Sequence, residues 1–163
     1  MKRLLRALTL ALIPLAPQAQ AAPDVFTLYQ SRGWEVFYLS SPGSAPLCNL
    51  WTKGANDRNV AMTISSDGRG ETSISITNQL INFDGAKGQI DLWIDRREGW
   101  YANVDGSGNT LFLWYPQRDL IAEIYQGRAF YVDLGQDGYA EYVFSLRGSA
   151  AALHALADCI SKL

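Results

Sequence analysis

The sequence is poor in the residues from which most metal sites are built. It has one histidine, His154, and two cysteines, Cys48 and Cys159, among its 163 residues. Structural zinc sites use four Cys or His ligands, so this set is too small to hold zinc, and neither cysteine belongs to a C-x-x-C motif. We therefore expect no metal and no other cofactor.

Basic charge and long apolar runs are also scarce. The chain has 14 Lys and Arg against 16 Asp and Glu, and no basic run offsets this balance. A surface of this sign is unsuited to nucleic acid. The longest apolar stretch, Ala7–Ala16, falls well short of the ~20 residues that span a bilayer.

The first 21 residues have the three-part pattern of a secretory signal. Lys2, Arg3 and Arg6 precede the apolar stretch, and Ala19-Gln20-Ala21 is a small-x-small cleavage site. We predict a signal peptide over residues 1–21 and a single secreted, β-rich domain over residues 22–163. Cleavage of this signal peptide would remove three basic and no acidic residues. Residues 22–163 then carry 11 basic and 16 acidic side chains, a net charge of −5. The expected location is periplasmic, with no membrane span in the mature form.

Export places Cys48 and Cys159 in a compartment where disulfides persist, and an even number of cysteines leaves none unpaired. We predict a bond between them. It would close a loop of about 110 residues and contribute about 4–5 kcal/mol on the chain-entropy model. Two buried thiols or one reactive cysteine are the alternatives.

From Trp34 to about Leu146 the sequence predicts short strands separated by turns that combine Gly with Asp or Asn. Alternating apolar positions predict sheets with one buried and one wet face. Trp34–Leu39 and Leu111–Tyr115 are apolar on both faces and are expected to be central strands covered on both sides. The predicted fold class is mainly β, an antiparallel β-sandwich of about seven to nine short strands.

Two segments have helical patterns. Gln117–Gln126 follows Pro116 and ends before Gly127, and Asp119 lies in its first turn, where a negative charge is favourable. Ser149–Ser161 carries an apolar stripe that includes Cys159, so this cysteine is expected to face the core.

Three groups of polar residues are candidates for catalytic or metal sites. His154 and Asp158 are four residues apart on a helix, but no G-x-S-x-G nucleophile motif accompanies them, so a solvated surface pair is expected. Asn103–Gly108 resembles the start of a calcium loop without its closing Glu, and a hairpin turn explains it better. Asp91, Asp95 and Glu98 would form an acidic cleft only if they converged in a pocket.

The aromatic residues suggest a binding surface. Ile90, Leu92 and Ile94 set the inward register of their strand, so Trp93 should point outward with Asp91 and Asp95. Tyr101 and Tyr131 are expected on the same kind of face, and an outward aromatic surface is a candidate contact for a protein or cell-envelope component. The alternative is that the helices cover this face and make Trp93 part of the core.

Several segments resemble the invasion-associated locus B family, small secreted proteins of Gram-negative bacteria. These segments are Gly33-Trp34-Glu35-Val36, Cys48-Asn49-Leu50, residues 119–124 and 127–129, and residues 144–153 with Cys159. Type VI secretion accessory proteins of the periplasm have a similar ending. The chain has Phe37 and Tyr38 where the family usually has a cysteine, and it lacks the family's mid-chain cysteine pair. The resemblance implies a periplasmic, β-sandwich-like fold without known catalysis, and it supplies no catalytic residues.

These observations together predict a non-enzymatic periplasmic protein that binds another protein or an envelope component. The alternative is a small periplasmic hydrolase or hydrolase inhibitor that uses the acidic cleft.

Overall fold

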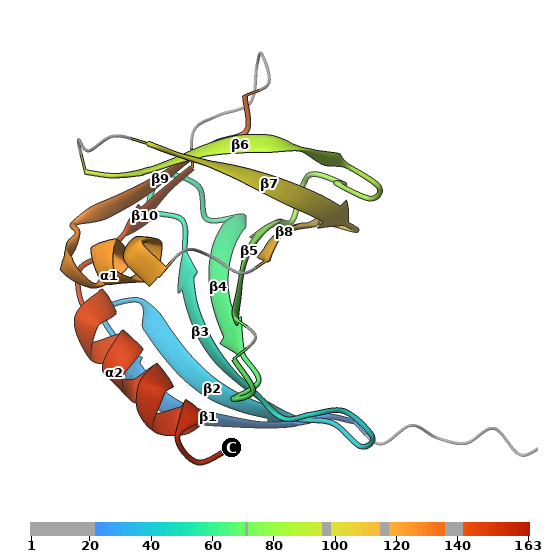
Figure 1. Cartoon of the computed structure of the whole chain (residues 1–163), viewed down its shortest axis with the longest axis vertical. Coiled ribbons are helices and arrows are strands. Elements are labelled where there is room, and N and C mark those ends of the chain that lie inside the picture. The colour runs from blue at the N-terminus through green and yellow to red at the C-terminus, as the bar shows by residue number, and fades with distance from the viewer. Residues whose placement is uncertain (1–21, 71, 96–98, 115–117, 136–141) are drawn as a thin grey trace, which may run out of the picture.

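The computed structural model describes residues 22–70, 72–95, 99–114, 118–135 and 142–163. The predicted signal peptide lies outside these residues. Within these residues the fold is mainly β, with ten antiparallel strands in one sheet and two helices (Figure 1). The predicted fold class is confirmed in its antiparallel strands, its short helix and its C-terminal helix.

The first five strands follow one another in the sheet in chain order. The alternation is clearest in β4, where the side chains of Val60, Met62 and Ile64 are buried and the residues between them are small or polar. This is the period of two that a half-covered sheet requires. The strands are β1 (Asp24–Ser31), β2 (Trp34–Ser40), β3 (Leu47–Lys53), β4 (Val60–Ser66) and β5 (Thr72–Asn78).

The remaining strands join the sheet in a different order. After β5 come β8, β7 and β6, followed by β9 and β10. The hairpin predicted near Asn103–Gly108 is present, because β7 and β8 pair antiparallel with Ser107 opposite Thr110. Its turn is Gly108-Asn109, however, and residues 103–107 belong to β7. The bounds are β6 (Lys87–Ile94), β7 (Trp100–Ser107), β8 (Thr110–Trp114), β9 (Ala129–Asp133) and β10 (Tyr142–Ser145).

The sheet curls until its last strand reaches its first half. The Ala55 N–H, just after β3, donates to the Val143 carbonyl at 2.6 Å, and the Val143 N–H donates to Asn56 Oδ1 at 2.9 Å. Across the interior, Asn78 Nδ2 donates to the Tyr142 hydroxyl at 2.8 Å. These bonds hold β10 beside the β3–β4 loop, so the concave side of the sheet encloses the core.

Both helices lie on the concave side of the sheet (Figure 1). They are α1 (Arg118–Gln126) and α2 (Ser149–Ile160), close to the predicted ranges. Gly127 ends α1 where there is no room for a side chain, because a Cβ there would overlap Ile94 and Leu146. The Ser149 hydroxyl donates to the Ile124 carbonyl at 2.8 Å and ties α2 to α1.

The predicted disulfide is confirmed. Cys48 on β3 and Cys159 on α2 are bonded, with their Cα atoms 6.0 Å apart and a separation of 111 positions in sequence. Both side chains are buried, at 0% and 3% exposure. The bond therefore fastens the end of α2 to the concave side of the sheet, and the described residues contain no free cysteine.

Two features of the sheet differ from the sequence predictions. Strand β1 was not expected, because Val25, Phe26 and Leu28 lack the alternation of a half-buried strand, and all three are exposed. The segments expected to be covered on both sides are covered on one: Phe112 is half-buried and Trp114 is 54% exposed. Since both helices lie on the concave side, neither of them covers the outer face of β2 or β8 in the part of the chain that the structure describes.

Candidate functional site

The outer face of β6 and β9 carries a pair of stacked aromatic rings. Trp93 lies directly opposite Tyr131 in the register of these strands. The two ring centroids are 5.4 Å apart and the ring planes differ by 2°. Neighbouring side chains on the same strands, Leu92 and Phe130, point inward and are at most 1% exposed. The alternation predicted for Trp93 is therefore present, and neither helix covers its side of the sheet.

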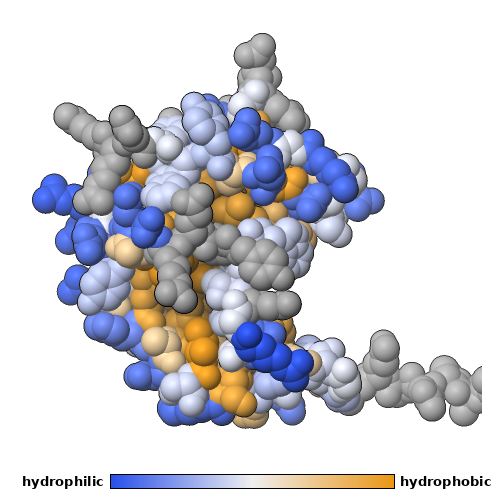
Figure 2. Space-filling view, in the orientation of Figure 1, coloured by the Kyte–Doolittle hydropathy of each residue, from blue (hydrophilic) through white to orange (hydrophobic). Residues whose placement is uncertain are grey.

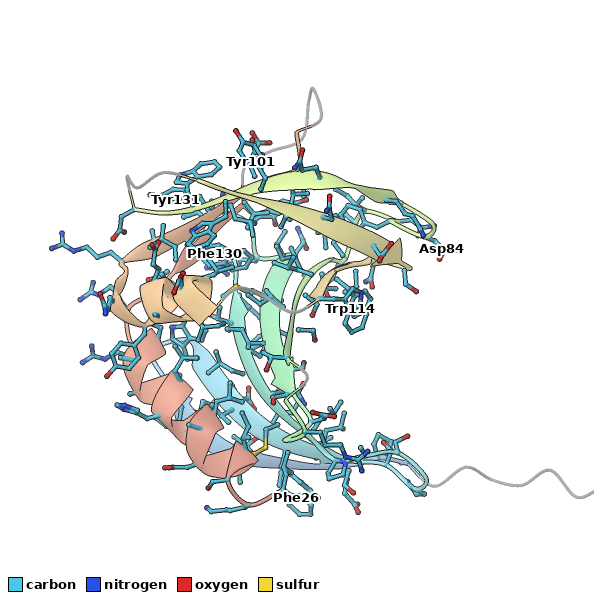
Figure 3. All side chains as sticks on the ribbon, viewed as in Figure 1. Phe26, Asp84, Tyr101, Trp114, Phe130 and Tyr131 are labelled. Atoms are coloured by element: carbon cyan, nitrogen blue, oxygen red, sulfur yellow. A yellow bond between two sulfur atoms is a disulfide. The ribbon has the colours of Figure 1, made fainter. Side chains whose placement is uncertain are left out.

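Tyr101 and two carboxylates extend this surface. Tyr101, on β7, is 73% exposed and lies opposite Asp91. Asp91 in turn lies opposite Asp133 on β9. In Figure 3, Tyr101 and Tyr131 project from the outer side of the sheet, whereas Phe130 projects toward the interior. We call Trp93, Tyr101, Tyr131, Asp91 and Asp133 the outer patch.

Asp95 was expected on the outer patch but has a structural role instead. It lies just beyond β6 in a left-handed conformation, with φ 56°. Its Oδ1 accepts hydrogen bonds from the backbone N–H groups of Arg128 at 3.1 Å and Ala129 at 3.0 Å. Sequence alternation missed this role because the strand ends one residue earlier, at Ile94.

The alternative acidic cleft gains no support from the described residues. Asp95 is turned toward the backbone at the start of β9, and Glu98 lies outside the described residues. His154 is exposed, as predicted, but its Nε2 lies 3.5 Å from the Tyr125 hydroxyl, and the two rings meet edge to face. In the described part of the chain, no group of three or more His, Cys, Asp or Glu could hold a metal ion.

Two further surfaces were not anticipated. Phe112 and Trp114 stack on the outer face of β8, with centroids 5.4 Å apart. Alternation along β8 could have shown this, because Leu111 points inward. A second surface is an open groove of about 430 Å³ between the helices and β4, with Tyr125 and His154 among its lining residues. Figure 2 shows an apolar strip between α2 and the sheet.

The described helices include none that is both long and apolar enough to cross a lipid bilayer.

Comparisons with protein-family models, with curated proteins and with solved structures found no match for this chain. The resemblance to the invasion-associated locus B family therefore stays a prediction from sequence.

Proposed function

We propose that this protein is an exported, non-enzymatic binding protein that uses the outer patch to hold a protein or another component of the cell envelope. The observation that carries the proposal is the stacked Trp93–Tyr131 pair, with exposed Tyr101 nearby, on a face that no helix covers. The periplasmic location and the family resemblance belong to the same proposal and rest on the sequence.

The physical support for binding comes from what these rings would gain on contact. A large aromatic ring at a surface offers much apolar area and loses few rotamers when a partner covers it, so such rings dominate many interfaces. The same rings contribute little to the core, because they face away from it. Their place on the outer side is therefore better explained by a partner than by folding.

A binding role also fits the chemistry of the patch better than hydrolysis does. Glycoside hydrolysis needs two carboxylates about 5–10 Å apart in a cleft that can accept a sugar and raise the pKa of one of them. Asp91 and Asp133 lie opposite each other on the open outer face of the sheet. A pair on an open face favours contact with a partner over acid–base catalysis.

The proposal is tested by capture from a cell-envelope extract with the purified protein as bait. The test variant is Trp93→Ala with Tyr131→Ala. The matched control is Phe26→Ala with Leu28→Ala, which also removes two exposed apolar side chains, but from β1. We expect one component to be retained by the wild type and the control and lost with the test variant. Equal retention by all three proteins would show that the outer patch is not the binding surface.

A further inference from the structure

The outer patch has a chemical character that narrows its partner. Asp91 and Asp133 are cross-strand neighbours, so their Cβ atoms are about 4.5–5.5 Å apart. Like charges in directly opposite positions destabilise a sheet. Asp133 Oδ1 accepts the backbone N–H of Gly135 at 2.9 Å, and Asp91 has no hydrogen bond or ion pair with the described residues. The patch therefore presents two carboxylates that a cation from outside would stabilise.

Beside these carboxylates is the face of the Trp93 ring that Tyr131 does not contact. One face of the Trp93 ring is occupied by Tyr131, on the β9 side. On the β7 side the nearest backbone is that of Gly99, whose missing Cβ would lie 3.9 Å from the Cβ of Trp93. Tyr101 stands two residues further along, opposite Asp91. Trp93, Tyr101 and Asp91 are therefore neighbours on the outer face, and Gly99, which lies next to Trp93 on the β7 side, carries no side chain.

We propose that these aromatic rings and carboxylates bind an arginine side chain of a partner protein, so that the outer patch docks a basic segment. The inference rests on the proposed function and specifies the chemistry of the partner. A guanidinium group is planar, stacks on aromatic faces and donates paired hydrogen bonds to a carboxylate. Trp93 and Tyr101 supply the aromatic faces, and Asp91 and Asp133 supply the acceptors.

Other partners fit the patch less well. A polyanion such as nucleic acid would be repelled by the two carboxylates. A purely apolar protein surface would remove water from Asp91 without giving it a partner, which is costly. A lysine side chain satisfies the charge but cannot stack as a plane or donate in a fork. An uncharged glycan could stack on the rings, but its binding would not depend on the charge of the carboxylates.

The test is titration of the purified protein with three capped peptides, hexa-arginine, hexa-lysine and hexa-glutamate, followed by calorimetry at low and moderate salt. We expect hexa-arginine to bind more tightly than hexa-lysine by about threefold or more, because the two peptides carry equal charge and differ in geometry. Binding should weaken as salt rises, because the charges are exposed. Hexa-glutamate should not bind.

The decisive variant is Asp91→Asn with Asp133→Asn, which keeps the shape of the patch and removes its charge. The matched control is Asp24→Asn with Asp158→Asn, two exposed aspartates on β1 and α2, which changes the net charge by the same amount. We expect the patch variant to lose about tenfold in affinity for hexa-arginine and the control to lose less than about twofold. Equal losses would show attraction to overall charge, and the proposal would be wrong.

Two further outcomes separate this inference from the proposed function. If capture depends on Trp93 and Tyr131 but hexa-arginine does not bind, the arginine assignment fails and the binding function remains. The same conclusion follows if an uncharged glycan, with chitohexaose as the probe, binds at the patch with no effect of salt. Equal binding of hexa-arginine and hexa-lysine would also overturn the arginine assignment.

Discussion

The two faces of β6 and β9 are built from alternate residues of the same strands, yet only one of the two faces packs into the core. On the inner face, Ile94, Phe130 and Val132 are fully buried in the core. On the outer face, Trp93 and Tyr131 stack on each other next to Asp91 and Asp133. Folding accounts for the inner set, because burial of apolar area stabilises the chain. The outer set has no such explanation, and this contrast is the basis of the proposed function.

The largest effect is expected at the disulfide, which joins α2 to the inner face of β3. Replacing both Cys48 and Cys159 by Ala should lower the free energy of unfolding by about 4–5 kcal/mol on the chain-entropy model, because the bond closes a loop of 111 residues. Urea unfolding of the variant and the oxidised wild type measures the difference. Capture through the outer patch should persist under conditions where the variant is folded, because the patch lies on other strands. A stability loss below about 1 kcal/mol would mean that α2 docks without needing the bond.

The next prediction compares the loss of stability on replacing two neighbouring residues of β9. Phe130→Ala should cost about 3–5 kcal/mol, because it leaves a cavity beside Phe144 in the core. Tyr131→Ala removes a ring of similar size from the outer face, where the loss is limited to its contact with Trp93, about 1 kcal/mol. Both values come from denaturant unfolding. Similar losses for the two variants would show that the outer ring is part of the core after all.

The faces of these strands could be predicted from sequence because alternation depends on only a few neighbouring residues. Ile90, Leu92 and Ile94 set the inward register, and Trp93 followed from it. The side on which the helices lie could not be predicted, because it depends on contacts between segments far apart in the chain. For this reason the sequence does not decide whether Trp93 is covered or exposed, and it wrongly predicts that β2 and β8 are covered on both sides.

Local sequence pattern identifies some residues of the candidate site and misjudges others. Tyr101 and Tyr131 were identified from local pattern, and the structure places both on the outer side. Asp133 was missed because its pairing with Asp91 joins two strands about 40 residues apart. Asp95 was included because it continued the alternation, although the chain turns at that residue. Pairing partners and strand ends are set by the fold as a whole, so local pattern misjudges both.

An intermediate loss of stability is expected at Asp95, which lies just beyond the end of β6. Asp95→Ala should cost about 1–3 kcal/mol, because it removes a charged acceptor from two backbone N–H groups at the start of β9. Asp95→Asn should cost less, since asparagine tolerates a positive φ and keeps one oxygen acceptor. Thermal unfolding ranks the three proteins. Capture through the outer patch should be unchanged in Asp95→Asn, and a loss of capture there would place Asp95 in the binding surface.

The smallest effect concerns the access of solvent to Trp93 itself. Trp93 is half-buried on the outer face, whereas Trp34 on the inner face is 1% exposed. Acrylamide should quench the fluorescence of the wild type more than that of Trp93→Phe, because the variant lacks one of the tryptophans that solvent can reach. Bound hexa-arginine should remove that difference, since a guanidinium stacked on the free face of Trp93 excludes the quencher. If the two proteins are quenched equally in the absence of peptide, Trp93 is covered, and a partner could reach the outer patch only through Tyr101 and the carboxylates.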